Sequence, residues 1–200
     1  MTKIRILVLA STLIAFVSHA AYAQRVAVSL QTNYPVAIGD TFLSNYGGSP
    51  GVGATIDVPI RGFLIRPTYQ YYRIDNGVSP EQRTFEMVAA LSGYFHFVRI
   101  GFGRSFELSP RISLVADVGV GGTHFLHKVT GSTHPNSRRA TNGASMWVGI
   151  NPTYRIGGSI GIGFTAGYNG VFLEKWNNTD TGYDHQYHAV SLEGRVVYYL

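Results

Sequence analysis

The sequence HAVSLEGRVVYYL, residues 188–200, decides the fold. Side chains of a β-strand point alternately to its two faces. One face of this stretch carries His188, Val190, Leu192, Gly194, Val196, Tyr198 and Leu200, and the other carries Ala189, Ser191, Glu193, Arg195, Val197 and Tyr199. A soluble sheet rarely leaves such an apolar strand uncovered at its edge. In a closed transmembrane barrel, by contrast, the last strand pairs with the first.

Seven further segments alternate in the same way, so the sequence predicts eight strands in total. The expected strands span residues 24–34, 51–60, 63–73, 84–97, 112–126, 143–155, 159–172 and 188–200. Their connections are alternately long and short, with long loops at 35–50, 74–83, 127–142 and 174–183. This order is typical of outer-membrane barrels, which have long extracellular loops and short periplasmic turns. The predicted fold is all-β, an eight-stranded antiparallel up-and-down transmembrane β-barrel.

Two neighbouring stretches leave alternatives open. Residues 79–82 read Ser-Pro-Glu-Gln, a helix-capping pattern, so 80–91 could form a short helix instead of a strand. Within 84–97 we expect Phe95 and Phe97 to face outward and His96 inward. Over 98–110 the apolar residues change parity, which predicts a bulge or turn near Phe97 to Arg99.

The charged residues determine which face points inward. Seven charges share the polar faces of the expected strands: Asp57, Arg66, Glu86, Asp117, Arg155, Glu193 and Arg195. A charge in hydrocarbon costs several kcal/mol, so this face should line the lumen, where the charges pair and fill the space. The alternative is a soluble lipocalin-like cup, which would place these charges outside.

Composition restricts the remaining possibilities. Residues 1–23 have the basic, apolar and small-x-small order of a signal peptide, ending at Ala21-Tyr22-Ala23, so residues 24–200 form the expected barrel domain. There is no cysteine, which excludes disulfides and thiolate sites. Removing the leader lowers Lys plus Arg from 16 to 14 against 11 acids, a net charge of +3 that does not suggest nucleic acid. No mature stretch is apolar enough for a transmembrane helix.

The chain resembles the small outer-membrane β-barrel family of the OmpA/OmpX transmembrane type, a porin-like β-barrel domain. Residues 192–200, LEGRVVYYL, look like the family's assembly signal, although Leu200 stands where phenylalanine is usual; residues 91–97, LSGYFHF, repeat the pattern. The resemblance implies a cell outer-membrane location, contact with outer-membrane lipid and lipopolysaccharide, insertion by the barrel-assembly machinery, and a monomer. It supplies no catalytic motif.

Histidines are the main candidates for chemistry. His124, His127 and His134 lie at or beyond one strand end, and His185 and His188 lie near another, but their spacing does not require a metal. In lipid-A deacylases a His-x-Ser pair shares one face; here His188 and Ser191 are three residues apart and should face opposite sides.

Three basic residues of the 127–142 loop, Lys128, Arg138 and Arg139, could contact lipopolysaccharide phosphates. Neither these residues nor the histidines define a catalytic, cofactor or metal site, so we expect none. We therefore expect a non-enzymatic outer-membrane protein with a structural, adhesive or surface-interaction role. The alternatives are a lipid-A-modifying enzyme and a narrow passive pore.

Overall fold

The computed structural model describes residues 25–39, 47–75, 90–131, 134–174 and 186–200, excluding the side chains of 47–48, 75, 90–92, 127–131 and 134–139. The predicted signal peptide at 1–23 and most of the ambiguous 80–91 stretch lie outside these residues. Among the described residues there is no helix long and apolar enough to cross a membrane.

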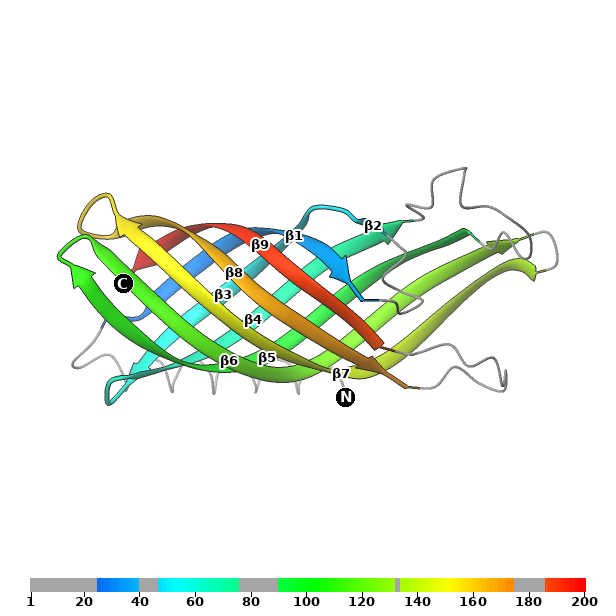
Figure 1. Ribbon diagram of the computed structural model, residues 1–200, viewed down its shortest axis with the longest axis horizontal. Coiled ribbons are helices and arrows are strands. Elements are labelled where there is room, and N and C mark those ends of the chain that lie inside the picture. The colour runs from blue at the N-terminus through cyan, green and yellow to red at the C-terminus, as the bar shows by residue number, and fades with distance from the viewer. Residues whose placement is uncertain (1–24, 40–46, 76–89, 132–133, 175–185) are drawn as a thin grey trace, which may run out of the picture.

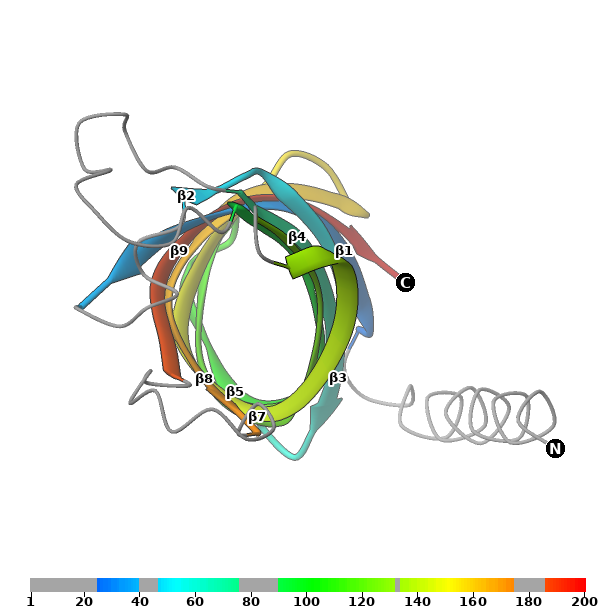
Figure 2. The same cartoon turned by 90° about the vertical axis from the view of Figure 1, so that its right-hand side faces the viewer.

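Within the described residues the chain forms nine strands (Figure 1). They are β1 (Ala27–Ile38), β2 (Gly47–Gly48), β3 (Gly51–Ile60), β4 (Phe63–Asp75), β5 (Ala90–Ser109), β6 (Ile112–Gly131), β7 (His134–Arg155), β8 (Ile160–Leu173) and β9 (Gln186–Tyr199). All pairings are antiparallel, and the short β2 pairs only with the end of β4. The eight long strands close into a barrel, which confirms the predicted fold (Figure 2).

The seam between β1 and β9 closes the ring. Every residue of β1 has a partner in β9, from Ala27 opposite Tyr199 to Ile38 opposite His188. The amide of Leu200 also donates to the carbonyl of Val26 at 2.8 Å. The C-terminal stretch therefore has the partner strand that its apolar face predicted.

Three tight connections gather at one end of the barrel, which we call the turn end. Arg61 and Gly62 both have positive φ, at 48° and 87°, as the turn between β3 and β4 requires. At the next turn the Ser109 hydroxyl accepts hydrogen bonds from the amides of Arg111 and Ile112. Residues 25 and 200 lie at this end too, and the long connections leave from the opposite end, the loop end (Figure 1).

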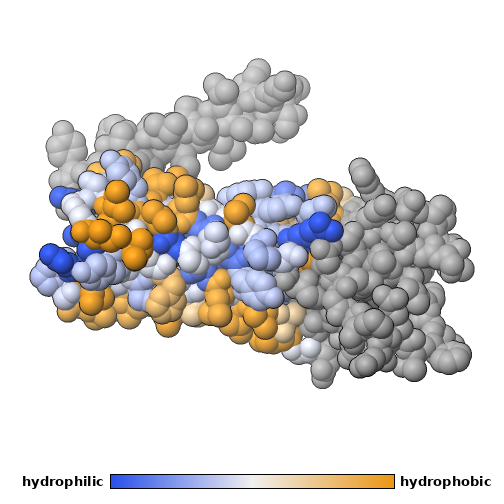
Figure 3. Space-filling view, turned by 90° about the horizontal axis from the view of Figure 1, so that it is seen from above, coloured by the Kyte–Doolittle hydropathy of each residue, from blue (hydrophilic) through white to orange (hydrophobic). Residues whose placement is uncertain are grey.

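The two faces of the wall differ as predicted. Leu30, Val98, Ile100 and Val120 are each 64–69% exposed on the outer face, and orange apolar patches mark the wall in Figure 3. The inner face holds buried polar groups such as Asn169, which is 1% exposed. A soluble cup would show the reverse arrangement, so the fold is that of a membrane-spanning barrel.

The prediction was wrong about β5 and about parts of two loops. β5 is continuous through residues 98–109, with Phe95 and Phe97 buried inside and Tyr94 exposed outside. Inward aromatic residues, and not a bulge near residue 98, explain the parity change. Most of the expected 127–142 loop continues β6 and β7 as a paired hairpin, and residues 35–38 of the expected 35–50 loop continue β1.

Candidate functional site: the lumen and its two ends

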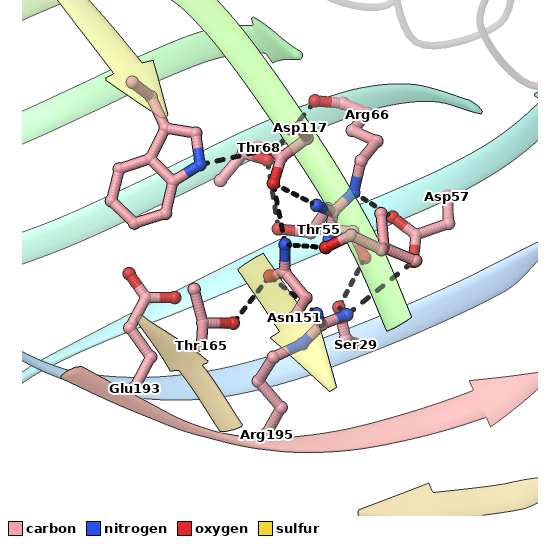
Figure 4. Close-up of polar contacts among 12 residues, drawn as sticks. Ser29, Thr55, Asp57, Arg66, Thr68, Asp117, Asn151, Thr165, Glu193 and Arg195 are labelled. Carbon is pink, nitrogen blue, oxygen red and sulfur yellow. Dashed lines mark hydrogen bonds and ion pairs between the residues drawn. The ribbon is translucent and has the colours of Figure 1, made fainter. Parts of the chain in front are cut away.

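An ion-pair network fills the middle of the lumen (Figure 4). Arg66 on β4 is its centre: Nε lies 2.7 Å from Asp57 Oδ1 on β3, and Nη1 lies 2.8 Å from Asp117 Oδ1 on β6. Arg195 on β9 approaches the second oxygen of Asp57 at 3.6 Å. Each of these four residues is at least nine-tenths buried, so the pairs are shielded from solvent and screened little by salt.

Asn151 on β7 connects the two arms of this network. Its Nδ2 donates to Asp117 Oδ1 at 2.7 Å, while its Oδ1 accepts from Arg195 Nη1 at 2.8 Å and from Thr165 Oγ1 on β8 at 2.6 Å. Arg195 Nη2 also donates to Ser29 Oγ on β1 at 3.2 Å. With a second donation from Nδ2 to the Val115 carbonyl at 3.2 Å, the amide meets its hydrogen-bonding capacity between a cation and an anion, as a buried polar group must.

A further arm lies toward the loop end and contains Arg99 and Glu193. Gln70 Nε2 donates to Glu193 Oε1 at 2.6 Å, and Gln70 Oε1 accepts from Arg99 Nη2. The Arg99 guanidinium stacks over Trp147 at 4.7 Å, and the Trp147 indole donates to Asp117 Oδ2 at 3.1 Å. All eight long strands therefore contribute to one set of contacts, which we call the charged network.

Charge is balanced inside the charged network. Its three acids are Asp57, Asp117 and Glu193, and its three bases are Arg66, Arg99 and Arg195. The space left among these side chains is about 20 Å³, enough for about one water molecule. The middle of the lumen is consequently filled, as predicted.

Nearer the loop end, a second layer closes the lumen with apolar side chains. Phe95 stacks on Phe125 at 4.3 Å and on Tyr187 at 5.4 Å, and Tyr72 stacks on Phe97 at 5.2 Å. The complete group, which we call the aromatic layer, consists of Tyr72, Ile74, Phe95, Phe97, Phe125, Val171, Leu173, Tyr187 and Ala189. Each of them is no more than 8% exposed.

Glycines on the inner face make room for the large side chains. A Cβ on Gly93 would lie 2.3 Å from Phe125, and a Cβ on Gly167 would lie 2.3 Å from Trp147. Since real Cβ atoms do not approach so closely, the aromatic residue and the opposing glycine form one fitted unit.

At the turn end the lumen widens into a cavity of about 330 Å³, which we call the vestibule. Arg155 and Arg195 line it, together with Asp57, Glu107 and Tyr199. The Arg155 guanidinium stacks on the Tyr199 ring at 4.6 Å. The charged network is the floor of the vestibule, because Asp57 and Arg195 belong to both.

Five of the seven predicted lumen charges lie in the charged network. Arg155 lines the vestibule instead, and Glu86 lies outside the described residues. Arg99 belongs to the network, but sequence reasoning did not count it among the lumen charges because the parity change beside it obscured its face. Its alternation with the outward Val98 and Ile100 was the signal that could have placed it inside.

The described histidine side chains lie on the outer wall. His124 Nδ1 lies 2.7 Å from Asn142 Oδ1, and His188 Nδ1 lies 2.5 Å from the Tyr168 hydroxyl. Ser191, at 4% exposed, points inward, so His188 and Ser191 do face opposite sides. No three metal-ligating side chains gather among the described residues.

Several rim candidates lie beyond what the structure describes. His185, and the side chains of His127, His134, Lys128, Arg138 and Arg139, lie outside the described residues.

No family model and no curated protein sequence matches the chain. Solved structures do match its fold. Neisserial surface protein A (NspA) aligns with a TM-score of 0.54 at 14% identity, covering 86% of this chain and 96% of that one. Ail, the attachment invasion locus protein of Yersinia pestis, gives 0.50 at 12%, covering 88% and 99%. A major outer membrane protein from Thermus thermophilus gives 0.61 at 10%, covering 90% and 100%. The chain therefore has an outer-membrane β-barrel fold.

Proposed function

We propose that this chain is an integral outer-membrane protein whose barrel serves as an anchor and whose function is carried by its surface. The role is structural, adhesive or surface-interacting, without catalysis or conduction. The observation that carries the proposal is a lumen filled by two successive layers, the charged network and the aromatic layer, inside a wall with an apolar exterior. A barrel closed in this way offers its outer surfaces, and not a channel, for interaction.

The outer wall supports the proposed location. Its exposed aliphatic residues suit hydrocarbon. Toward the loop end the wall carries aromatic and imidazole groups: Tyr69 hydrogen-bonds His96 at 2.9 Å, and Tyr94 is 39% exposed. Amphipathic rings of this kind favour the headgroup level of a membrane. We infer that this half of the wall contacts outer-leaflet lipid and lipopolysaccharide, and that the turn end faces the periplasm.

The solved structures that share this fold support a surface role. Two of them are described in their own right as a surface protein and as an attachment invasion protein. We propose a monomeric barrel, inserted by the barrel-assembly machinery.

Conductance in planar bilayers tests the closed lumen. We expect no single-channel steps from the wild-type barrel, whereas resolved steps would overturn the proposal. The double variant Phe95→Ala/Arg99→Ala removes bulk from both layers and is the positive control, which we expect to conduct. Refolding of the variant is checked by the change of its gel mobility on heating. The wild type must show the same change if it forms a barrel.

The surface role and the enzymatic alternative can be separated in cells. Lipid A is analysed by mass spectrometry with and without the protein, and binding of cells to surfaces is measured in parallel. We expect unchanged lipid A. A lipid A species that appears only with the protein would replace our proposal with the lipid-A-modifying enzyme.

A further inference from the structure

The vestibule at the turn end is large enough to hold a ligand. Its volume of about 330 Å³ falls at the lower end of the range of small-molecule sites, roughly 300–1,000 Å³. The charged network closes it from the rest of the lumen, so it is a cup with one mouth. In the proposed membrane orientation that mouth opens to the periplasm.

Arg155 differs from the arginines of the charged network because its side chain has no hydrogen-bond or ion-pair partner among the described residues. Its Nε is buried and unpaired, whereas Arg66 makes two ion pairs. Stacking on Tyr199 holds the guanidinium in place. The barrel thus holds an uncompensated and pre-positioned cation at the wall of a cavity.

The surrounding charges leave the vestibule cationic. Asp57 and Arg195 form part of its floor and belong to the charge-balanced network, where they lie 3.6 Å apart. Arg25 also lines the cavity while donating to the Gly158 carbonyl at 2.7 Å. The remaining acid, Glu107, is exposed and makes no ion pair with Arg155, so the two cations Arg25 and Arg155 face one acid.

The walls also offer apolar surface beside this cation. Leu64, Val115 and Val197 line the same cavity as the Ser113 and Thr153 hydroxyls. We propose that the vestibule binds a small soluble organic anion, whose carboxylate or phosphate group pairs with Arg155 and whose apolar body lies against these residues. A guanidinium is suited to this because its planar set of donors matches the oxygens of both groups.

Isothermal titration calorimetry on the full barrel refolded in zwitterionic detergent tests this site. The probes are phenyl phosphate, benzoate and the neutral benzyl alcohol. We expect binding of one or both anions and none of the alcohol, and the tighter anion identifies the preferred group. The proposal is overturned if neither anion binds at millimolar concentration.

Matched variants locate the binding. Arg155→Gln should weaken the anion at least tenfold. Arg111→Gln removes the same charge from the exposed turn at the same end, outside the vestibule lining, and should leave affinity unchanged. If both variants lost the same affinity for the anion, the effect would be one of general charge, and the proposed site would be wrong.

A second variant covers the case in which Arg155→Gln does not fold. Ser113→Trp fills the cavity without altering any charge, and it should abolish binding in a barrel whose gel mobility still shifts on heating. Retained affinity in folded Ser113→Trp would contradict the proposal. Because the measurement is made in micelles, its failure would not bear on the outer-membrane role, which is tested by conductance and in cells.

Discussion

The charged network and the aromatic layer block the same lumen by opposite physical means. The network consists of six buried ions linked by amides and hydroxyls, and each ion depends on its partners. The aromatic layer consists of stacked rings and aliphatic side chains that, apart from the hydroxyls of Tyr72 and Tyr187, only fill space. Removing one member of the network therefore leaves a defect of charge, while removing one member of the layer leaves a defect of volume.

The largest expected effect comes from Arg66, whose loss would leave buried Asp117 without an ion pair and Asp57 with only its 3.6 Å contact to Arg195. Arg66→Met should destabilise the refolded barrel by about 3–5 kcal/mol, the usual result of breaking a buried ion pair. Urea unfolding in detergent, followed by tryptophan fluorescence, measures this. The double variant Arg66→Met/Asp117→Asn should recover part of the loss because it leaves two acids and two bases in the network and keeps the contact of Asp57 with Arg195. If the double variant were less stable than the single one, charge would not be the cause.

The aromatic layer should respond to volume alone. Phe125→Ala should cost about 3 kcal/mol, in the range for truncating a buried aromatic residue, and Phe125→Leu clearly less. The same urea titration measures both. Bilayer recordings should show no conductance from Phe125→Ala, because the charged network below stays intact. Channel steps from this single variant would mean that the network does not seal the lumen by itself.

Trp147 lies between the two regions, and Gly167 controls its position. A Cβ at 167 would overlap the indole ring, so Gly167→Val should cost about 1–3 kcal/mol through overpacking. It should also displace the indole from Asp117 and Arg99, which a shift in Trp fluorescence would report. Gly158→Val, at a turn glycine with open space around it, is the control. An unchanged emission spectrum in Gly167→Val would contradict the fitted contact.

The smallest effect tests a single neutral donor of the network. Thr165 donates to the Asn151 oxygen at 2.6 Å, and Thr165→Val keeps the shape while removing the donor. Arg195 still donates to that oxygen, so the cost should be about 1 kcal/mol. A loss comparable to that of Arg66→Met would show that hydroxyls matter as much as ions here, and the contrast between the two regions would narrow.

Sequence reasoning recovered most of the network but little of the aromatic layer, of which it placed Ala189 on the inner face, and the reason is physical. Charges such as Asp57, Arg66 and Glu193 identify the inner face because hydrocarbon excludes them. An inward Phe95 or Phe97 carries no such mark, since an apolar ring is equally acceptable in lipid and in a packed lumen. The number of long strands, the seam and the tight turns followed from the alternation of polar and apolar residues. The vestibule could not be predicted in this way, because it depends on how far the inward side chains near the turn end fill the lumen.

The β1–β9 seam also sets a condition on biogenesis. It pairs residue 27 with residue 199, which lie near opposite ends of the described sequence. Contacts of such sequence separation form late, because loop closure must precede them. Until then both outermost strands present an unpaired edge that can bind another chain. A newly made barrel of this kind therefore needs a chaperone that covers both edges until the whole chain has arrived. A copy cleaved before its last strand arrives would keep an unpaired edge and would aggregate with neighbouring chains.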